Sequence, residues 1–160
     1  MDEIQAMKSP VRLEDRQELR GILEYKVYRH RGDAKKLIDE FMEENLIVNG
    51  ARNQMARLIA GSFTNRNINR ISFGTNGTAP VVENTVITGA FTKAVAGFTY
   101  PAMGQVTIAW NLLTTENNGM AIREFGLICA DNTLFSRRVR ANPIHKESDI
   151  SIEGQWTIIF

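Results

Sequence analysis

The sequence has little of the side-chain chemistry on which many enzymes depend. Its 160 residues include one cysteine, Cys129, and two histidines, His30 and His145. A lone cysteine excludes an internal disulfide, and its apolar neighbours favour a small buried side chain. Neither histidine has a nucleophile or metal ligand at a recognised spacing, so we interpret both as surface residues. We therefore predict no enzymatic activity, no metal and no other cofactor.

Long apolar runs and an excess of one charge are also missing. No stretch approaches the roughly 18 apolar residues that indicate a membrane span. The first residues, MDEIQ, have neither the basic start nor the apolar core of a secretory signal. The formal net charge is +1, so bulk charge gives no reason to expect a nucleic-acid partner.

What the sequence does contain is alternation of apolar and polar residues with a period of two. Between residues 148 and 160 the apolar side chains include Ile150, Ile152, Trp156 and Ile158. The same pattern recurs at 106–112 and 23–27. A strand places such residues on one face, whereas a helix would scatter them. Gly154 interrupts the last pattern and indicates a bulge or a close approach.

Turn signals separate these segments. Asn-Gly occurs at 49–50, 76–77 and 118–119, and both residues tolerate the positive φ of tight hairpins. Residues 31–33 (Arg-Gly-Asp) and 130–132 (Ala-Asp-Asn) are further predicted turns. The second lies between strands expected at 125–129 and 133–139, which predicts a hairpin.

Helical signals are few. Residues 51–60 have helical spacing, with Asn49 as the expected cap and Gly61 at the expected left-handed end. A second helix is predicted at 10–20, but its apolar residues are sparse and alone it would be marginal. We interpret residues 1–20 as an N-terminal arm that orders against a partner or remains mobile. Residues 21–160 then form one mainly β domain of eight or nine strands, an antiparallel β-sandwich or open barrel with one short helix.

One acidic residue lies in an unexpected place. Glu124 stands inside an apolar stretch, and a buried carboxylate there needs Arg123, Arg138 or a backbone donor as a partner. We predict a structural role for it.

The strongest electrostatic feature is the basic group Arg137, Arg138 and Arg140. Strand alternation places Arg137 and Arg138 on opposite faces, so one side can pair with acids of a neighbouring strand or subunit. We predict that these arginines, together with Leu13 and Leu19 of the arm, are assembly contacts.

The order of several short motifs carries a resemblance. They are NLIVNGAR (45–52), INRISFGTNG (68–77), NGMAIREFGL (118–127), TLFSR (133–137) and the terminal WTIIF (156–160). Over roughly residues 40–160 the chain resembles small virion proteins of tailed bacteriophages, including tail-fibre attachment and baseplate proteins. The resemblance implies a homo-oligomer that contacts other virion proteins without catalysis. It also implies synthesis in the bacterial cytoplasm before incorporation into the virion.

Other functions stay open. A collar or capsid-decoration subunit fits the same pattern. A carbohydrate-binding β-sandwich would present exposed aromatic residues, for which Trp110, Tyr100, Phe98 and Phe91 are candidates, although the aliphatic register of Trp110 favours the core. A hydrolase acting on cell-wall glycan through Glu124 is disfavoured by the scarcity of catalytic residue types.

Overall fold

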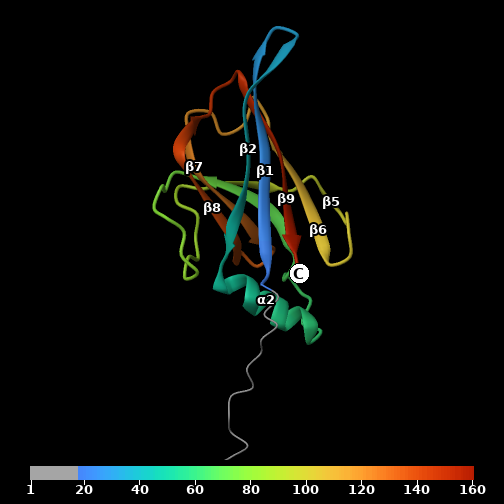
Figure 1. Ribbon diagram of the computed structural model, residues 1–160. Coiled ribbons are helices and arrows are strands. Elements are labelled where there is room, and N and C mark those ends of the chain that lie inside the picture. Colours follow the sequence, from blue (N-terminus) through green and yellow to red (C-terminus); the bar gives the residue numbers. More distant parts are fainter. Residues whose placement is uncertain (1–17) are drawn as a thin grey trace, which may run out of the picture.

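The computed structural model describes residues 18–160, and these residues form nine strands and one helix (Figure 1). The elements are β1 (Arg20–Arg31), β2 (Ala34–Ile47), α2 (Asn49–Ile59), β3 (Ile68–Gly74), β4 (Phe91–Ala94), β5 (Gly97–Thr99), β6 (Gln105–Leu112), β7 (Ala121–Cys129), β8 (Leu134–His145) and β9 (Ile150–Ile159). All strand pairs are antiparallel. The predicted mainly β class with one short helix is confirmed.

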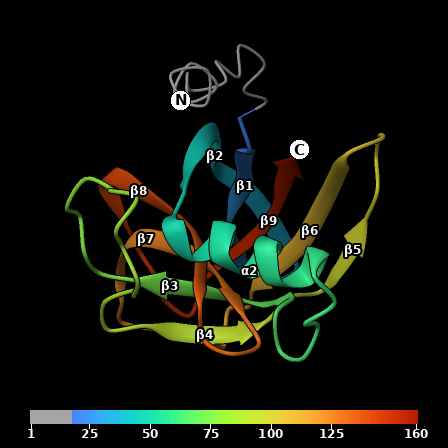
Figure 2. The same cartoon turned by 90° about the horizontal axis from the view of Figure 1, so that it is seen from below.

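The strands form one sheet in the order β4-β3-β7-β8-β2-β1-β9-β6-β5. The sheet curls into a half-barrel, and α2 lies across its open end in Figure 2. β2 pairs with β1 over most of its length, and only its last residues, Leu46 and Ile47, pair with β8. The first half of the sheet is therefore β5-β6-β9-β1-β2, and the second half is β2-β8-β7-β3-β4.

The two outermost strands of the sheet are nearly continuous in the chain. Only Val95 and Ala96 separate β4, which pairs with β3, from β5, which pairs with β6. Val95 donates its backbone N–H to Asn69 of the second half, and Ala96 donates to Ala109 of the first. The chain thus passes from one half of the sheet to the other, as corner strands do in packed sheets.

The core lies between the two halves. Ile150, Ile152, Trp156 and Ile158 are all buried, which confirms the period-two prediction for the last strand. Four aromatic rings from both halves meet there, with neighbouring centroids 4.9 to 6.1 Å apart. They belong to Tyr25, Phe73, Trp110 and Phe125.

Gly154 admits one of these rings. It lies opposite Trp110 in the pairing of β6 with β9, and a Cβ atom at this position would be 2.2 Å from the indole ring. The predicted close approach is confirmed. The pairings of β9 continue through Gly154 without a register shift, so the alternative of a bulge is wrong.

The helix and turns depart from prediction at particular residues. α2 begins at Asn49, two residues before the predicted start, with Val48 as its N-cap and no side-chain capping bond. The expected Asn49 cap is therefore wrong, and Asn49-Gly50 is helical rather than a turn. Gly61 has the predicted positive φ of 85°. The hairpin at 130–132 is confirmed by Asn132, with φ 71°, between β7 and β8.

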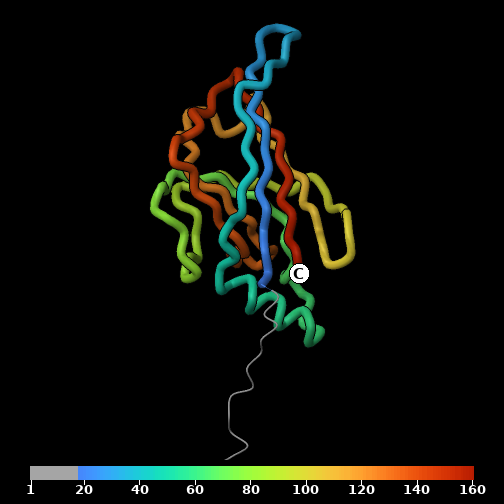
Figure 3. The backbone as a smooth tube through the Cα atoms, viewed as in Figure 1, coloured from blue at the N-terminus to red at the C-terminus, as the bar shows by residue number. Residues whose placement is uncertain are grey.

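The β1–β2 hairpin projects beyond the rest of the sheet in Figure 3. Its turn contains Gly32 with φ 56°, which confirms the turn predicted at 31–33. Within residues 18–160, the helix is too short and too polar to cross a bilayer. Leu13 and the greater part of the predicted arm and helix at 10–20 lie outside the described residues. Of that segment, Glu18 and Leu19 are not helical and Arg20 already belongs to β1.

Candidate functional site

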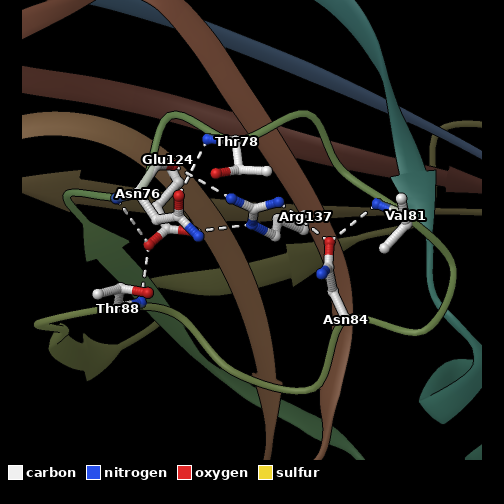
Figure 4. Close-up of polar contacts among 7 residues, drawn as sticks. All are labelled: Asn76, Thr78, Val81, Asn84, Thr88, Glu124 and Arg137. Atoms are coloured by element: carbon white, nitrogen blue, oxygen red, sulfur yellow. Dashed lines mark hydrogen bonds and ion pairs between the residues drawn. The ribbon is translucent and has the colours of Figure 1, made fainter.

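The most deeply buried ion pair among residues 18–160 joins neighbouring strands of the second half (Figure 4). Glu124 of β7 and Arg137 of β8 have side chains that are 0% and 1% exposed. The Arg137 Nε atom donates to Glu124 Oε2 at 2.7 Å. Glu124 is therefore buried as predicted, but its cation is Arg137 rather than Arg123 or Arg138.

The register of the two strands explains that choice. Arg137 lies opposite Gly126, and Glu124 is two residues away on the same face, so the two side chains meet diagonally. Arg138 lies opposite Phe125 and is carried to the other face. The sequence alone predicts that Arg137 and Arg138 separate, but it does not supply the cross-strand register that selects the partner.

The ion pair also holds the long connection between β3 and β4, residues 75–90. Glu124 Oε1 accepts the backbone N–H groups of Asn76 at 3.2 Å and Thr88 at 2.7 Å. Arg137 donates to the Asn76 carbonyl at 3.1 Å and to Asn84 Oδ1 at 3.0 Å. Figure 4 shows Glu124 directed toward Asn76 and Thr88, and Arg137 directed toward Asn84. A connection of this length without regular structure is uncommon in compact domains, and here buried charge orders it.

We call the Glu124–Arg137 pair and its hydrogen bonds to residues 75–90 the clamp. Apolar packing adds to it. Ile87, from the same connection, packs with Val48, Ile128 and Leu134 in a small cluster separate from the main core. Gly74 makes the close approach possible, because a Cβ atom there would be 2.5 Å from both Glu124 Oε1 and the Ile87 side chain. Gly74, within the motif at 68–77, therefore serves packing against a buried carboxylate.

Arg138 and Arg140 bridge the gap where β8 separates from β2. Arg138 pairs with Glu43 and donates to the Glu44 carbonyl at 3.0 Å. Arg140 pairs with Asp39 at 3.0 Å. Side-chain bonds thus replace the backbone ladder that these two strands form only at residues 46 and 47 of β2.

The same arginines cover two stacked aromatic rings. The Arg138 and Arg140 guanidinium groups lie 5.4 and 5.8 Å from the Phe41 ring centroid, and the Phe41 ring stacks on Tyr25 at 5.0 Å. Arg140 also donates to the Tyr25 hydroxyl at 2.7 Å. Burial raises the pKa of Tyr25 to about 12, although the nearby Arg140 charge acts in the opposite direction.

These positions bear on the predicted assembly contacts. Arg137 is buried inside the protein, so the structure corrects its assignment: a side chain that is 1% exposed cannot reach another subunit in this conformation. Arg138 and Arg140 are partly exposed although internally paired, and their role in assembly stays a prediction. Leu19 is partly buried and packs against the main core.

A buried lysine orders the connection between β6 and β7. Lys146 is fully buried, and its Nζ donates to Asn118 Oδ1 at 2.7 Å and to the Glu147 carbonyl at 3.0 Å. Its third acceptor is the Thr114 carbonyl at 3.4 Å. Burial lowers the pKa of this amine because the charged form loses hydration. The sequence places Lys146 near the basic group of β8 but does not predict its burial, because its oxygen partners belong to loop residues without a motif.

The histidines do not form a recognisable reaction centre. His30 Nε2 lies 2.7 Å from Ser151 Oγ, a pair that joins β1 and β9 and that sequence spacing could not reveal. Asp149 pairs with Arg29, and within residues 18–160 the His30 ring donates no hydrogen bond to a carboxylate. His145 is exposed at the end of β8. In this part of the chain no group of three acidic, histidine or cysteine residues is arranged to hold a metal ion.

The aromatic residues considered for glycan binding fall into two groups. Trp110 is buried in the core, as its register predicted, and Phe91 is partly buried beside Phe73. Phe98 is 45% exposed and Tyr100 is 78% exposed. Both line an apolar groove of about 710 Å³, together with Ile68, Val106, Ile108 and Phe160. This groove, which we call the mouth, offers accessible aromatic side chains to a ligand or partner.

Comparisons of the chain with protein-family models, with curated proteins and with solved structures found no match.

Proposed function

We propose that this chain is a non-enzymatic structural protein of a tailed-phage virion, which assembles by protein–protein contacts in the tail, baseplate or fibre-attachment region. The observation that carries the proposal is the mouth, where the large apolar side chains of Phe98, Tyr100 and Phe160 line one groove and stay exposed. Exposed apolar surface of this kind is typical of an interaction site.

The use of buried polar groups supports the same function. The eight buried polar or charged side chains of residues 18–160 all form internal hydrogen bonds; they are Gln54, Ser72, Thr107, Glu124, Ser136, Arg137, Lys146 and Ser151. Such bonds join strands, fix the helix or hold connections. Buried polar side chains whose hydrogen bonds are formed within the protein make a scaffold more rigid.

The order of the sequence motifs supports a role in a phage virion. The segments INRISFGTNG and NGMAIREFGL, which resemble phage virion proteins, include Asn76 and Glu124 of the clamp that orders residues 75–90. The resemblance therefore coincides with residues that have a structural task in the fold. This resemblance is the reason that we propose a virion subunit rather than an assembly protein of another kind.

The test is association with particles. A tagged copy is expressed in the phage-infected or lysogenic host that encodes the chain, and virions and free tails are separated from soluble protein on a density gradient. We expect the chain at fixed stoichiometry in tail or virion fractions by mass spectrometry. Its presence only in the soluble fraction would contradict the proposal. Its presence on tail-less heads would instead identify a capsid-decoration protein.

A glycan-binding module is the second candidate, favoured by the exposure of Phe98 and Tyr100. Aromatic faces in a groove are a common sugar platform because they stack on apolar C–H surfaces. Glycan-array binding that is lost in both Phe98→Ala and Tyr100→Ala, and kept in the neighbouring Thr99→Ala, would support this function.

A further inference from the structure

The mouth is an uncovered continuation of the core. In the antiparallel pairing of β5 with β6, Phe98 lies opposite Ile108, which is buried, so both side chains face the interior. Tyr100 follows Phe98 with the same parity, and Phe160 follows the buried Ile158 in the same way. Phe98, Tyr100 and Phe160 all line the mouth, and their side chains are 45%, 78% and 56% exposed.

The chain supplies a segment at this place. Arg20 pairs with Ile159 at the end of β9, one residue before Phe160, and Leu19 packs against the core. Residues 1–17 therefore join the described chain beside the mouth. This segment carries the apolar residues Ile4, Met7, Val11 and Leu13, and a chain of 17 residues can span up to roughly 56–61 Å when extended.

The N-terminal segment and the mouth both carry apolar side chains that burial would remove from water. The helix predicted at 10–20 is too sparse in apolar residues to be stable alone, and the mouth exposes aromatic surface that a partner would bury. If two copies meet at this end about a two-fold axis, each segment begins next to the other copy's mouth. Both mouths and both segments are then buried in one isologous interface, which covers more apolar area than either copy covers by itself.

We infer that the mouth binds residues 1–17 of a second copy of this chain, so that two copies exchange N-terminal segments. Leu13 and its apolar neighbours pack on Phe98 and Tyr100 of the partner. The inference rests on the proposed function in one respect, the assembly of copies with one another, and it adds the segment and the surface that mediate this assembly.

Engineered cysteines test which chain provides the segment. In a Cys129→Ala background, which removes the single native thiol, Leu13→Cys and Tyr100→Cys are introduced into separate copies, mixed and mildly oxidised. We expect a covalent dimer on a non-reducing gel, and the same dimer when both changes are in one chain. The matched control replaces Tyr100→Cys with Thr99→Cys, since Thr99 has the opposite parity, and it should cross-link at least tenfold less.

The alternative outcomes are separable. An intrachain disulfide in the doubly substituted chain, or equal cross-linking at positions 99 and 100, would overturn the inference. Sedimentation gives a second measure: Leu13→Ser, Phe98→Ser and Tyr100→Ser should each raise the dimer dissociation constant about tenfold or more, while Thr99→Ser should not. Unchanged dissociation constants would also overturn the inference. The proposed function would still stand if the chain were found in particles. Absence from particles would instead remove the proposed function even if the cross-link formed.

Discussion

Replacing Glu124 with glutamine removes the negative charge of the buried clamp but keeps the size of the side chain. The variant therefore tests how much the charge contributes to stability. In the native protein Glu124 Oε1 accepts two backbone N–H groups, and Oε2 accepts Arg137 Nε at 2.7 Å. The glutamine side chain has the same size, and its carbonyl oxygen can keep the two backbone bonds. Its amide group then points N–H donors at the Arg137 guanidinium, which is itself only a donor.

The expected cost is large because the guanidinium is left buried without a counter-charge. Removing one partner of a buried ion pair destabilises a protein by about 3–5 kcal/mol. For a chain of this size 1 kcal/mol corresponds to about 2–4 °C in melting temperature, so Glu124→Gln should lower the melting temperature by roughly 10 °C. The matched control is Glu153→Gln, which breaks the exposed pair with Lys35 and should cost about 1 kcal/mol or less.

Two measurements locate the effect. Urea unfolding gives the free-energy change, and native-state hydrogen exchange should show faster exchange at the Asn76 and Thr88 amides, which Glu124 holds. Adding Arg137→Met to Glu124→Gln should cost less than the sum of the single changes, because the unpaired charge is gone. A loss below about 1 kcal/mol for Glu124→Gln, or strictly additive losses, would refute this account of the clamp.

Three further predictions concern the core and a connection. Gly154→Ala should destabilise the protein by about 1–3 kcal/mol in urea unfolding, since its Cβ would lie 2.2 Å from the Trp110 ring; a neutral result would mean that the ring has free space. Burial raises the pKa of the Cys129 thiol from 9.0 to about 11, so the unfolded chain loses this proton first and stability falls as pH rises from 9 to 11. Between pH 8 and pH 11 the free energy of unfolding should therefore fall by about 2–3 kcal/mol more in the parent than in Cys129→Ala. Parallel pH profiles of the two proteins would contradict the pKa shift. Lys146→Met should cost about 1–3 kcal/mol because carbonyl groups lose their donor, and a stable variant with an unchanged β6–β7 connection would show that water replaces the amine.

Several features of the fold could be predicted because local patterns carry them. Alternation over 150–158 places those apolar residues on one face wherever the strand pairs, and the left-handed Gly61 ends the helix as its position indicates. The start of α2 was mispredicted because Asn49-Gly50 is favourable in a turn, and here packing overrides that preference. Gly50 lies where a Cβ atom would be 2.6 Å from the Leu134 carbonyl, so this glycine serves the close packing of the helix on β8.

The mainly β class, the inward positions of the last strand and the burial of Glu124 can all be predicted from sequence, because each depends on the nature and spacing of neighbouring residues. Three features emerge only from the folded chain: Arg137 is the partner of Glu124, this pair holds residues 75–90, and Phe98 and Tyr100 line an uncovered mouth. These depend on register between strands and on which layer covers which face. Both arise from contacts between residues far apart in the chain, which no local pattern specifies.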